Sequence, residues 1–196
     1  MSAAPRVVLA SASARRRKLL ALLVPVFGVI PSEVDEQLEA GPLPSAIARL
    51  AERKARAVAG ASPGAVVLGA DTMVIIDGDA LGKPADIPDA LAMLRRLRGR
   101  EHEVITGVAV VAADGSVRSD TATTRVAMAR FADDLIERYA ASGTTLDKAG
   151  GYAVQDLDGA LVDAVVGPYS NVVGLPLALT ARLLRETGVA VSAPWS

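Results

Sequence analysis

Short runs of β-branched apolar residues alternate along the chain with stretches in which apolar residues recur every three or four positions. The first pattern is typical of buried strands and the second of amphipathic helices. The runs that predict strands cover residues 6–11, 26–30, 65–70, 73–76, 104–112 and 117–128. The stretches that predict helices cover residues 14–23, 44–59, 88–97, 133–141 and 176–186. An Asp-Gly turn at 114–115 predicts that the last two strands form a long hairpin.

Strands and helices alternate in the first part of the chain, and the hairpin follows in the middle. This order predicts a mixed α/β (α+β) fold, in which a mixed sheet is flanked by helices around a central cleft. The sequence contains no internal repeat, no low-complexity segment and no linker rich in Pro, Gly or Ser. We therefore expect residues 1–196 to form a single domain.

The composition excludes several classes of function. There are 21 basic and 22 acidic residues, and only two Phe, three Tyr and one Trp, so a nucleic-acid-binding module is disfavoured. The absence of Cys excludes disulfides and thiolate metal sites. No apolar run reaches the roughly 18 residues that a membrane span needs. The first basic cluster follows an apolar run, the opposite order from a secretory signal, so we expect a cytoplasmic protein without membrane contacts.

His102 is the only histidine of the chain. It lies between Glu101 and Glu103 in a predicted polar turn, which favours a surface or structural role over catalysis. The sequence also contains no G-x-S-x-G motif, so a serine hydrolase is poorly supported.

The segment from Ser11 to Arg17 joins a predicted strand to a predicted helix and contains two serines and three arginines. Backbone N–H groups, hydroxyls and guanidinium groups at a helix start together form a site suited to phosphate. An ordinary capped helix with a solvated basic face is the alternative.

Asp71 follows a predicted buried strand, where a carboxylate is well placed to hold a divalent cation or to accept a proton from water. The alternative is an Asp that caps a turn. Lys83 lies in a rigid Gly-Lys-Pro turn and could reach a phosphate. The spacing of the preceding glycines does not fit a Walker A loop, and Pro84 stands where the motif needs Ser or Thr.

Lysine is rare in this chain, with four Lys against 17 Arg, so each Lys is a candidate for a role that needs a compact ammonium group. Lys54 lies between Ala51 and Ala55, beside the small apolar face of its helix rather than on the charged face. Glu36 ends an acidic loop, for which simple solubility is the alternative interpretation.

Eight segments occur in one order along the chain: LASASARRR, SEVDE, LAERKA, GADTMV, LGKP, HEVITGVAV, DKAGGYAVQ and NVVGLPL. This series resembles the Maf family of nucleoside triphosphate pyrophosphatases over about residues 7–184. The resemblance implies a mixed α/β fold with a cleft between two lobes, similar in outline to inosine triphosphate pyrophosphatases. It also implies a homodimer.

The resemblance further implies roles for single residues. The catalytic residues it implies are Asp71, as proton acceptor, with Lys54 and Lys83. The substrate-binding residues it implies are Ser11, Arg15, Arg16, Thr72 and Gln155. Glu36 and Asp71 would hold a divalent cation, Mg²⁺ or Mn²⁺. The chain departs from the family pattern at Ala14, where Pro is usual, so we expect a looser turn there rather than a lost site. It departs again at Asp156, where Gly is usual.

The function implied is hydrolysis of nucleoside triphosphates to the monophosphate and pyrophosphate. Thr72 and Gln155 resemble the branch that acts on dTTP and UTP, with modified pyrimidine nucleotides as further candidates. The Gln amide offers both a donor and an acceptor to a pyrimidine that presents N3–H between two carbonyls. The alternative is a non-enzymatic nucleotide-sensing protein that acts in septum formation and cell-division control.

Overall fold

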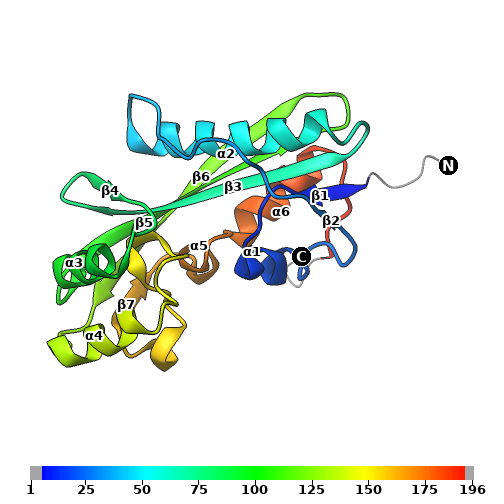
Figure 1. Ribbon diagram of the computed structural model, residues 1–196. Coiled ribbons are helices and arrows are strands. Elements are labelled where there is room, and N and C mark those ends of the chain that lie inside the picture. The colour runs from blue at the N-terminus through cyan, green and yellow to red at the C-terminus, as the bar shows by residue number, and fades with distance from the viewer. Residues whose placement is uncertain (1–5, 193–196) are drawn as a thin grey trace. The chain divides into compact units, whose positions relative to one another are not determined.

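The computed structural model describes residues 6–192. Figure 1 shows its helices and strands. The first half of the chain forms β1 (Val7–Leu9), α1 (Ala14–Leu20), β2 (Gly28–Val29), α2 (Leu43–Gly60), β3 (Val66–Ile76), β4 (Asp79–Leu81) and α3 (Ile87–Leu97). The second half forms β5 (Glu101–Val111), β6 (Val117–Met128), α4 (Asp133–Ala141), the short 3₁₀ helices η1 (Ala149–Gly151) and η2 (Asp156–Gly159), β7 (Val162–Val166), α5 (Tyr169–Val173) and α6 (Leu177–Glu186). The five predicted helices are confirmed to within a few residues at each end.

The strands form a seven-stranded sheet in the order β2-β1-β3-β5-β6-β7, and β4 pairs with β3. β1 runs parallel to both β2 and β3, whereas the pairs β3–β4 and β6–β7 are antiparallel. The sheet is therefore mixed, which confirms the predicted α/β class. No helix within residues 6–192 is long and apolar enough to span a membrane.

The chain divides into two compact units. The first comprises residues 6–71, 106–122 and 174–192, and the second comprises residues 72–105 and 123–173. β3, β5 and β6 each contribute residues to both units. The single-domain organisation and the central cleft expected from the sequence stay predictions.

In the first unit, alternate strand residues build two cores because successive side chains of a strand point to opposite faces. Val66, Leu68 and Ala70 of β3 pack with α1 and α6. Val67 of β3 packs instead with alanines of α2, and Figure 1 shows α2 lying along β3. Asp71 belongs to the register of Val67, so its side chain is on the face that α2 covers.

The second unit has its own core, formed by the remaining parts of β3, β5 and β6 with α3 and α4. α3 packs against α4 and against η1. η1 contains Gly150, which has a φ of 69° and lies so close to Val74 that an added Cβ would come within 2.9 Å of Val74 Cγ2. Only glycine combines this backbone conformation with this close approach.

Two predictions about single residues are wrong. β3 is unbroken, so Asp71 lies inside a strand rather than at the carboxyl end of one. The polar side chain is tolerated there because it has a charged partner on α2. His102 lies inside β5 and is 4% exposed, rather than in a polar turn. Strand alternation turns Glu101 and Glu103 toward water and His102 into the core.

The sequence pattern also missed three short elements, β4, β7 and α5. Each is short and contains at least one polar residue, so none lies in a continuous apolar run of the kind that predicted β1 and β2.

Candidate active site

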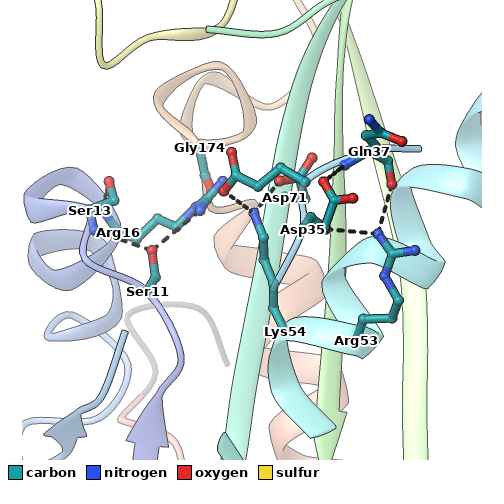
Figure 2. Close-up of polar contacts among 10 residues, drawn as sticks. Ser11, Ser13, Arg16, Asp35, Gln37, Arg53, Lys54, Asp71 and Gly174 are labelled. Atoms are coloured by element: carbon teal, nitrogen blue, oxygen red, sulfur yellow. Dashed lines mark hydrogen bonds and ion pairs between the residues drawn. The ribbon is translucent and has the colours of Figure 1, made fainter. Parts of the chain in front are cut away.

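Lys54 joins two carboxylates in the first unit (Figure 2). Its Nζ donates to Asp71 Oδ1 at 2.6 Å and to Glu36 Oε1 at 2.7 Å. The side chains of Lys54 and Asp71 are each 6% exposed, whereas that of Glu36 is 48% exposed. The three charges therefore form a group that is buried at one end and open at the other.

Two glycines explain why Lys54 lies against the sheet. A Cβ on Gly69 of β3 would come within 2.4 Å of the Ala51 carbonyl oxygen, and one on Gly107 of β5 within 2.7 Å of the Ile47 carbonyl oxygen. The backbone of α2 thus rests directly on both strands. Lys54 lies on this small-residue face of α2, and Asp71 is two residues after Gly69 on the same face of β3, so the two side chains meet.

Arg53, which precedes Lys54 on α2, holds the acidic loop in place. Its Nη2 donates to the carbonyl oxygens of Asp35 at 3.0 Å and Gln37 at 2.7 Å, on either side of Glu36 (Figure 2). A single guanidinium thereby fixes the backbone that presents Glu36 to Lys54. An arginine on the charged face of a helix gives no signal in the sequence for such a function.

The second oxygen of Asp71, Oδ2, is buried and has no hydrogen-bond partner among the described residues. A buried acceptor without a donor is costly and therefore uncommon in folded proteins. Such an atom can accept a proton from a bound water or coordinate a cation. The role of Asp71 as a proton acceptor stays a prediction, and the oxygen that would serve it lies in the middle of β3.

Ser11, Ser13 and Arg16 form a connected polar group at the start of α1 (Figure 2). Ser13 Oγ accepts from the Arg16 backbone N–H at 3.3 Å and caps the helix. Ser11 Oγ accepts from Arg16 Nη1 at 3.3 Å, and Arg16 Nε donates to the Gly174 carbonyl oxygen at 2.9 Å. Because α1 begins at Ala14 with this cap in place, the absence of Pro at that position does not remove the helix start.

The arginines of this segment differ in their surroundings. Arg15 and Arg16 are half-buried, whereas Arg17 is exposed. Burial lowers the pKa of the Arg16 guanidinium, while the negative charges of Asp71 and Glu36 raise it. The interpretation of the whole segment as a solvated basic face is therefore wrong for Arg16, which shares an electrostatic environment with the carboxylates around Lys54.

Glu36 and Asp71 offer the oxygen ligands that Mg²⁺ and Mn²⁺ prefer. Residues 6–192 contain no group of three or more His, Cys, Asp or Glu side chains arranged to hold a metal. Mg²⁺ at nucleotide sites is bound by one or two carboxylates together with substrate phosphates. Two carboxylates with one unpartnered buried oxygen fit that kind of site, in which the substrate completes the coordination.

Three residues named from the sequence lie in the second unit. Thr72 is half-buried on β3, Lys83 is exposed after β4, and Gln155 is exposed as the N-cap of η2. The backbone before Lys83 is tied to η1, since Gly150 N donates to the Gly82 carbonyl oxygen at 3.0 Å. That these three residues share one site with Asp71 stays a prediction.

The family model described as Maf-like protein matches residues 6–187 of the chain. The chain belongs to the Maf family. The match covers all the residues of the Lys54 and Arg16 groups, so the geometry described above is that of a Maf-like protein.

Several relatives are similar to this Maf-like chain over nearly its whole length. A dTTP/UTP pyrophosphatase of Anaeromyxobacter dehalogenans is 50% identical over 98% of both chains. A dTTP/UTP pyrophosphatase of Thermomicrobium roseum is 51% identical over 96% of this chain and 87% of its own. One from Hahella chejuensis is 46% identical over 97% of this chain and 95% of its own.

The fold is also similar to that of a solved structure. A HAM1 protein from Coxiella burnetii superposes with a TM-score of 0.54 over 93% of this chain and 99% of its own, at 17% identity. This similarity supports the mixed α/β fold.

Proposed function

We propose that this protein hydrolyses nucleoside triphosphates, with dTTP and UTP favoured, to the nucleoside monophosphate and pyrophosphate. The observation that carries the proposal is the buried Lys54–Asp71 pair with an unpartnered carboxylate oxygen, in a chain about half identical to dTTP/UTP pyrophosphatases. The names of these relatives describe an enzyme, so they give no support to a non-enzymatic sensor of nucleotides.

Asp71 is the general base of this proposal. The reaction breaks the P–O bond between the α- and β-phosphates and forms a new P–O bond to water. Asp71 Oδ2 is the unpartnered buried oxygen and takes the proton that the attacking water loses. Lys54 fixes the other oxygen of the same carboxylate at 2.6 Å, which orients Oδ2.

Arg15, Arg16 and Ser11 bind phosphate oxygens in this proposal. Arg16 is held by the Gly174 carbonyl oxygen and by Ser11 Oγ, so its guanidinium is oriented before substrate arrives. Fixed positive charge of this kind stabilises the negative charge that develops on the departing pyrophosphate. Lys83 is proposed as a further cation for the phosphates, and Thr72 and Gln155 as residues that recognise the base.

Glu36 and Asp71 would hold Mg²⁺ or Mn²⁺. When bound, the cation would neutralise phosphate charge and polarise a phosphoryl oxygen. The Glu36 side chain is half-exposed, and Arg53 holds the backbone on either side of it. Its carboxylate is therefore accessible to a metal–nucleotide complex that binds from solvent. The family resemblance supports a homodimer, and the order of basic and apolar residues near the N-terminus supports a cytoplasmic location, so we propose both.

The test is the release of pyrophosphate from dTTP, UTP, CTP and 7-methyl-GTP, each with Mg²⁺, with Mn²⁺ and with excess chelator. We expect turnover of dTTP and UTP that exceeds that of the other two substrates and is lost with chelator. Tight binding of dTTP without release of pyrophosphate would contradict the proposal and favour a sensor.

A further inference from the structure

A hollow of about 440 Å³ lies in the second unit beside Gln155. Its wall includes four consecutive residues of β7, the turn that carries Gln155, and Tyr169 of α5. All of these residues belong to the second unit. Hollows of a few hundred Å³ are the usual size for small-ligand sites.

Tyr169 differs from the other two tyrosines of the chain. Tyr139 and Tyr152 are each 5% exposed, and their hydroxyls are hydrogen bonded to Asp156 and His102 respectively. Tyr169 is 50% exposed and is one of the residues that line the hollow. An exposed ring beside a cavity is a stacking surface for a planar ligand.

β7 supplies backbone groups to the hollow. It is the last strand of the sheet, and among the described strands it pairs with β6 alone. Alternate residues of an edge strand point their N–H and C=O groups away from the sheet. The pairing is irregular around Asp163. The neighbouring β6 residues Ala127 and Met128 pair with Ala164 and Val162, so Asp163 is left as an extra residue in β7. Irregularities of this kind are frequent beside binding sites, where they redirect a side chain.

The turn that carries Gln155 is anchored from both sides to one buried side chain. The Tyr139 hydroxyl donates to Asp156 Oδ2 at 2.5 Å and accepts from the Ala153 backbone N–H at 3.3 Å. Lys148 Nζ lies 3.6 Å from the same Asp156 oxygen. Asp156, which replaces the Gly usual in the family, therefore helps to fix the turn. The Gln155 side chain caps no backbone group of η2, so its amide is not used within the turn.

We propose that this hollow is the base subsite, in which Tyr169 stacks on the pyrimidine ring. The ring's alternating carbonyl and N–H groups match the N–H and C=O groups of the β7 edge and the amide of Gln155. The inference deepens the proposed function and rests on it for the identity of the ligand. Tyr169 is then a residue that determines specificity, and Tyr139, Lys148 and Asp156 are positioning residues for Gln155.

The first experiment is photochemical cross-linking with 5-iodo-UTP, followed by mass spectrometry of the peptides. Irradiated 5-iodouracil joins covalently to an aromatic ring stacked on it, and the reaction does not require turnover. We expect the adduct on Tyr169, and its loss both in Tyr169→Leu and in the presence of excess dTTP. An adduct confined to peptides outside residues 154–169 would overturn the inference.

The second experiment measures kcat/KM for dTTP, UTP and ribose 5-triphosphate, which lacks a base. Tyr169→Ala should lower kcat/KM for dTTP and UTP by about ten-fold, the size of loss that follows removal of one stacking ring. It should leave ribose 5-triphosphate unaffected, and Tyr169→Phe should restore the wild-type value because it keeps the ring. Val166→Ala is the matched control, since Val166 is 58% exposed on β7 and does not line the hollow.

The two experiments separate the two proposals. A cross-link at Tyr169 in a protein that releases no pyrophosphate would support the subsite and contradict the hydrolase. Normal turnover of dTTP by Tyr169→Ala would overturn the subsite and leave the hydrolase intact.

Discussion

Two lysines are buried within residues 6–192, Lys54 in the first unit and Lys148 in the second. Lys54 joins Asp71, whose side chain is 6% exposed, to the half-exposed Glu36. Lys148 lies near the carboxylates of Asp147 and Asp156, whose side chains are 66% and 28% exposed. It also donates to the Thr144 carbonyl oxygen.

The difference lies in the carboxylates rather than in the lysines. Asp71 has one oxygen on Lys54 and a second, buried oxygen with no partner among the described residues. Asp156 has its Oδ2 occupied by the Tyr139 hydroxyl. Burial together with the Asp156 carboxylate raises the pKa of Tyr139, which keeps its hydroxyl a donor. Lys54 and Lys148 are therefore similarly buried but differ in role. Lys54 is a candidate for chemistry, whereas Lys148 is a structural anchor.

Asp71→Asn tests this contrast with the largest expected effect. The variant removes the proton acceptor and retains an oxygen for Lys54, so kcat for dTTP should fall by about 10²- to 10⁴-fold, the contribution of a general base. Asp77→Asn is the matched control, because Asp77 also pairs with cations, Arg96 and Arg100, but lies half-exposed in the second unit. Wild-type kcat in Asp71→Asn would remove Asp71 from the mechanism.

The pair Lys54→Met and Lys148→Met sharpens the comparison directly. Lys54→Met leaves Asp71 charged and buried without its closest partner, which should lower the free energy of unfolding by about 3–5 kcal/mol. Lys148→Met leaves its carboxylates in contact with water and should cost about 1 kcal/mol or less. Urea denaturation gives both values.

The kinetic signatures of these two variants should also differ. Lys54→Met should lower kcat, while Lys148→Met should raise KM for dTTP and leave kcat unchanged, because it acts on the Gln155 turn. Equal losses of kcat in both variants would break the distinction between the two lysines.

The buried His102–Tyr152 pair of the second unit is a further group that affects stability rather than chemistry. His102 Nε2 lies 2.7 Å from the Tyr152 hydroxyl, and burial lowers the pKa of His102 to about 4. The unfolded chain binds this proton near pH 6.5 and the folded chain only near pH 4, so stability is complete above pH 6.5 and falls as the pH drops toward 4.

The loss of stability over this pH range should amount to about 3 kcal/mol, since each unit of pKa corresponds to about 1.4 kcal/mol. Denaturation of wild type and His102→Gln between pH 4 and 7 measures the effect, and the variant should show a flatter dependence. A pH dependence that is the same in both proteins would show that another group is responsible.

Arg16→Ala compared with Arg17→Ala carries the smallest expected effect. Arg16 is oriented by Gly174 and Ser11, whereas Arg17 is exposed. Loss of charged hydrogen bonds to a phosphate should raise KM for dTTP by about 10- to 100-fold in Arg16→Ala. Arg17→Ala should stay close to wild type, and similar KM values for the two variants would favour a solvated basic face.

The sequence predicted the elements that carry a strong period and missed those that do not. The five helices and the long strands were found because their apolar residues recur at helical spacing or form long runs. β4, β7 and α5 were missed because each is short and interrupted by polar residues. β3 was divided in two because Asp71 and Thr72 interrupt its apolar run, although tertiary contacts keep it continuous.

For the site, the sequence named Lys54, Glu36, Asp71, Ser11 and Arg16, and the structure brings all of them together in the first unit. It did not reveal Arg53 as the residue that holds the Glu36 loop, because an arginine on a charged helix face looks solvated. It also placed His102 in a polar turn rather than in a strand, because the burial of that side chain depends on which strand face meets the core.

The fold class, the family and the residue types that the chemistry requires could all be predicted from the sequence, because periodicity and ordered motifs are local properties of the chain. The tertiary structure was needed to show which carboxylate oxygen lacks a partner, which arginine is oriented and which lysine serves as an anchor. These properties depend on distances between segments far apart in sequence, and for Lys54 and Asp71 the close approach of α2 to β3 at Gly69 sets that distance. A 2.6 Å contact between Lys54 and Asp71 cannot be inferred from their separation along the chain.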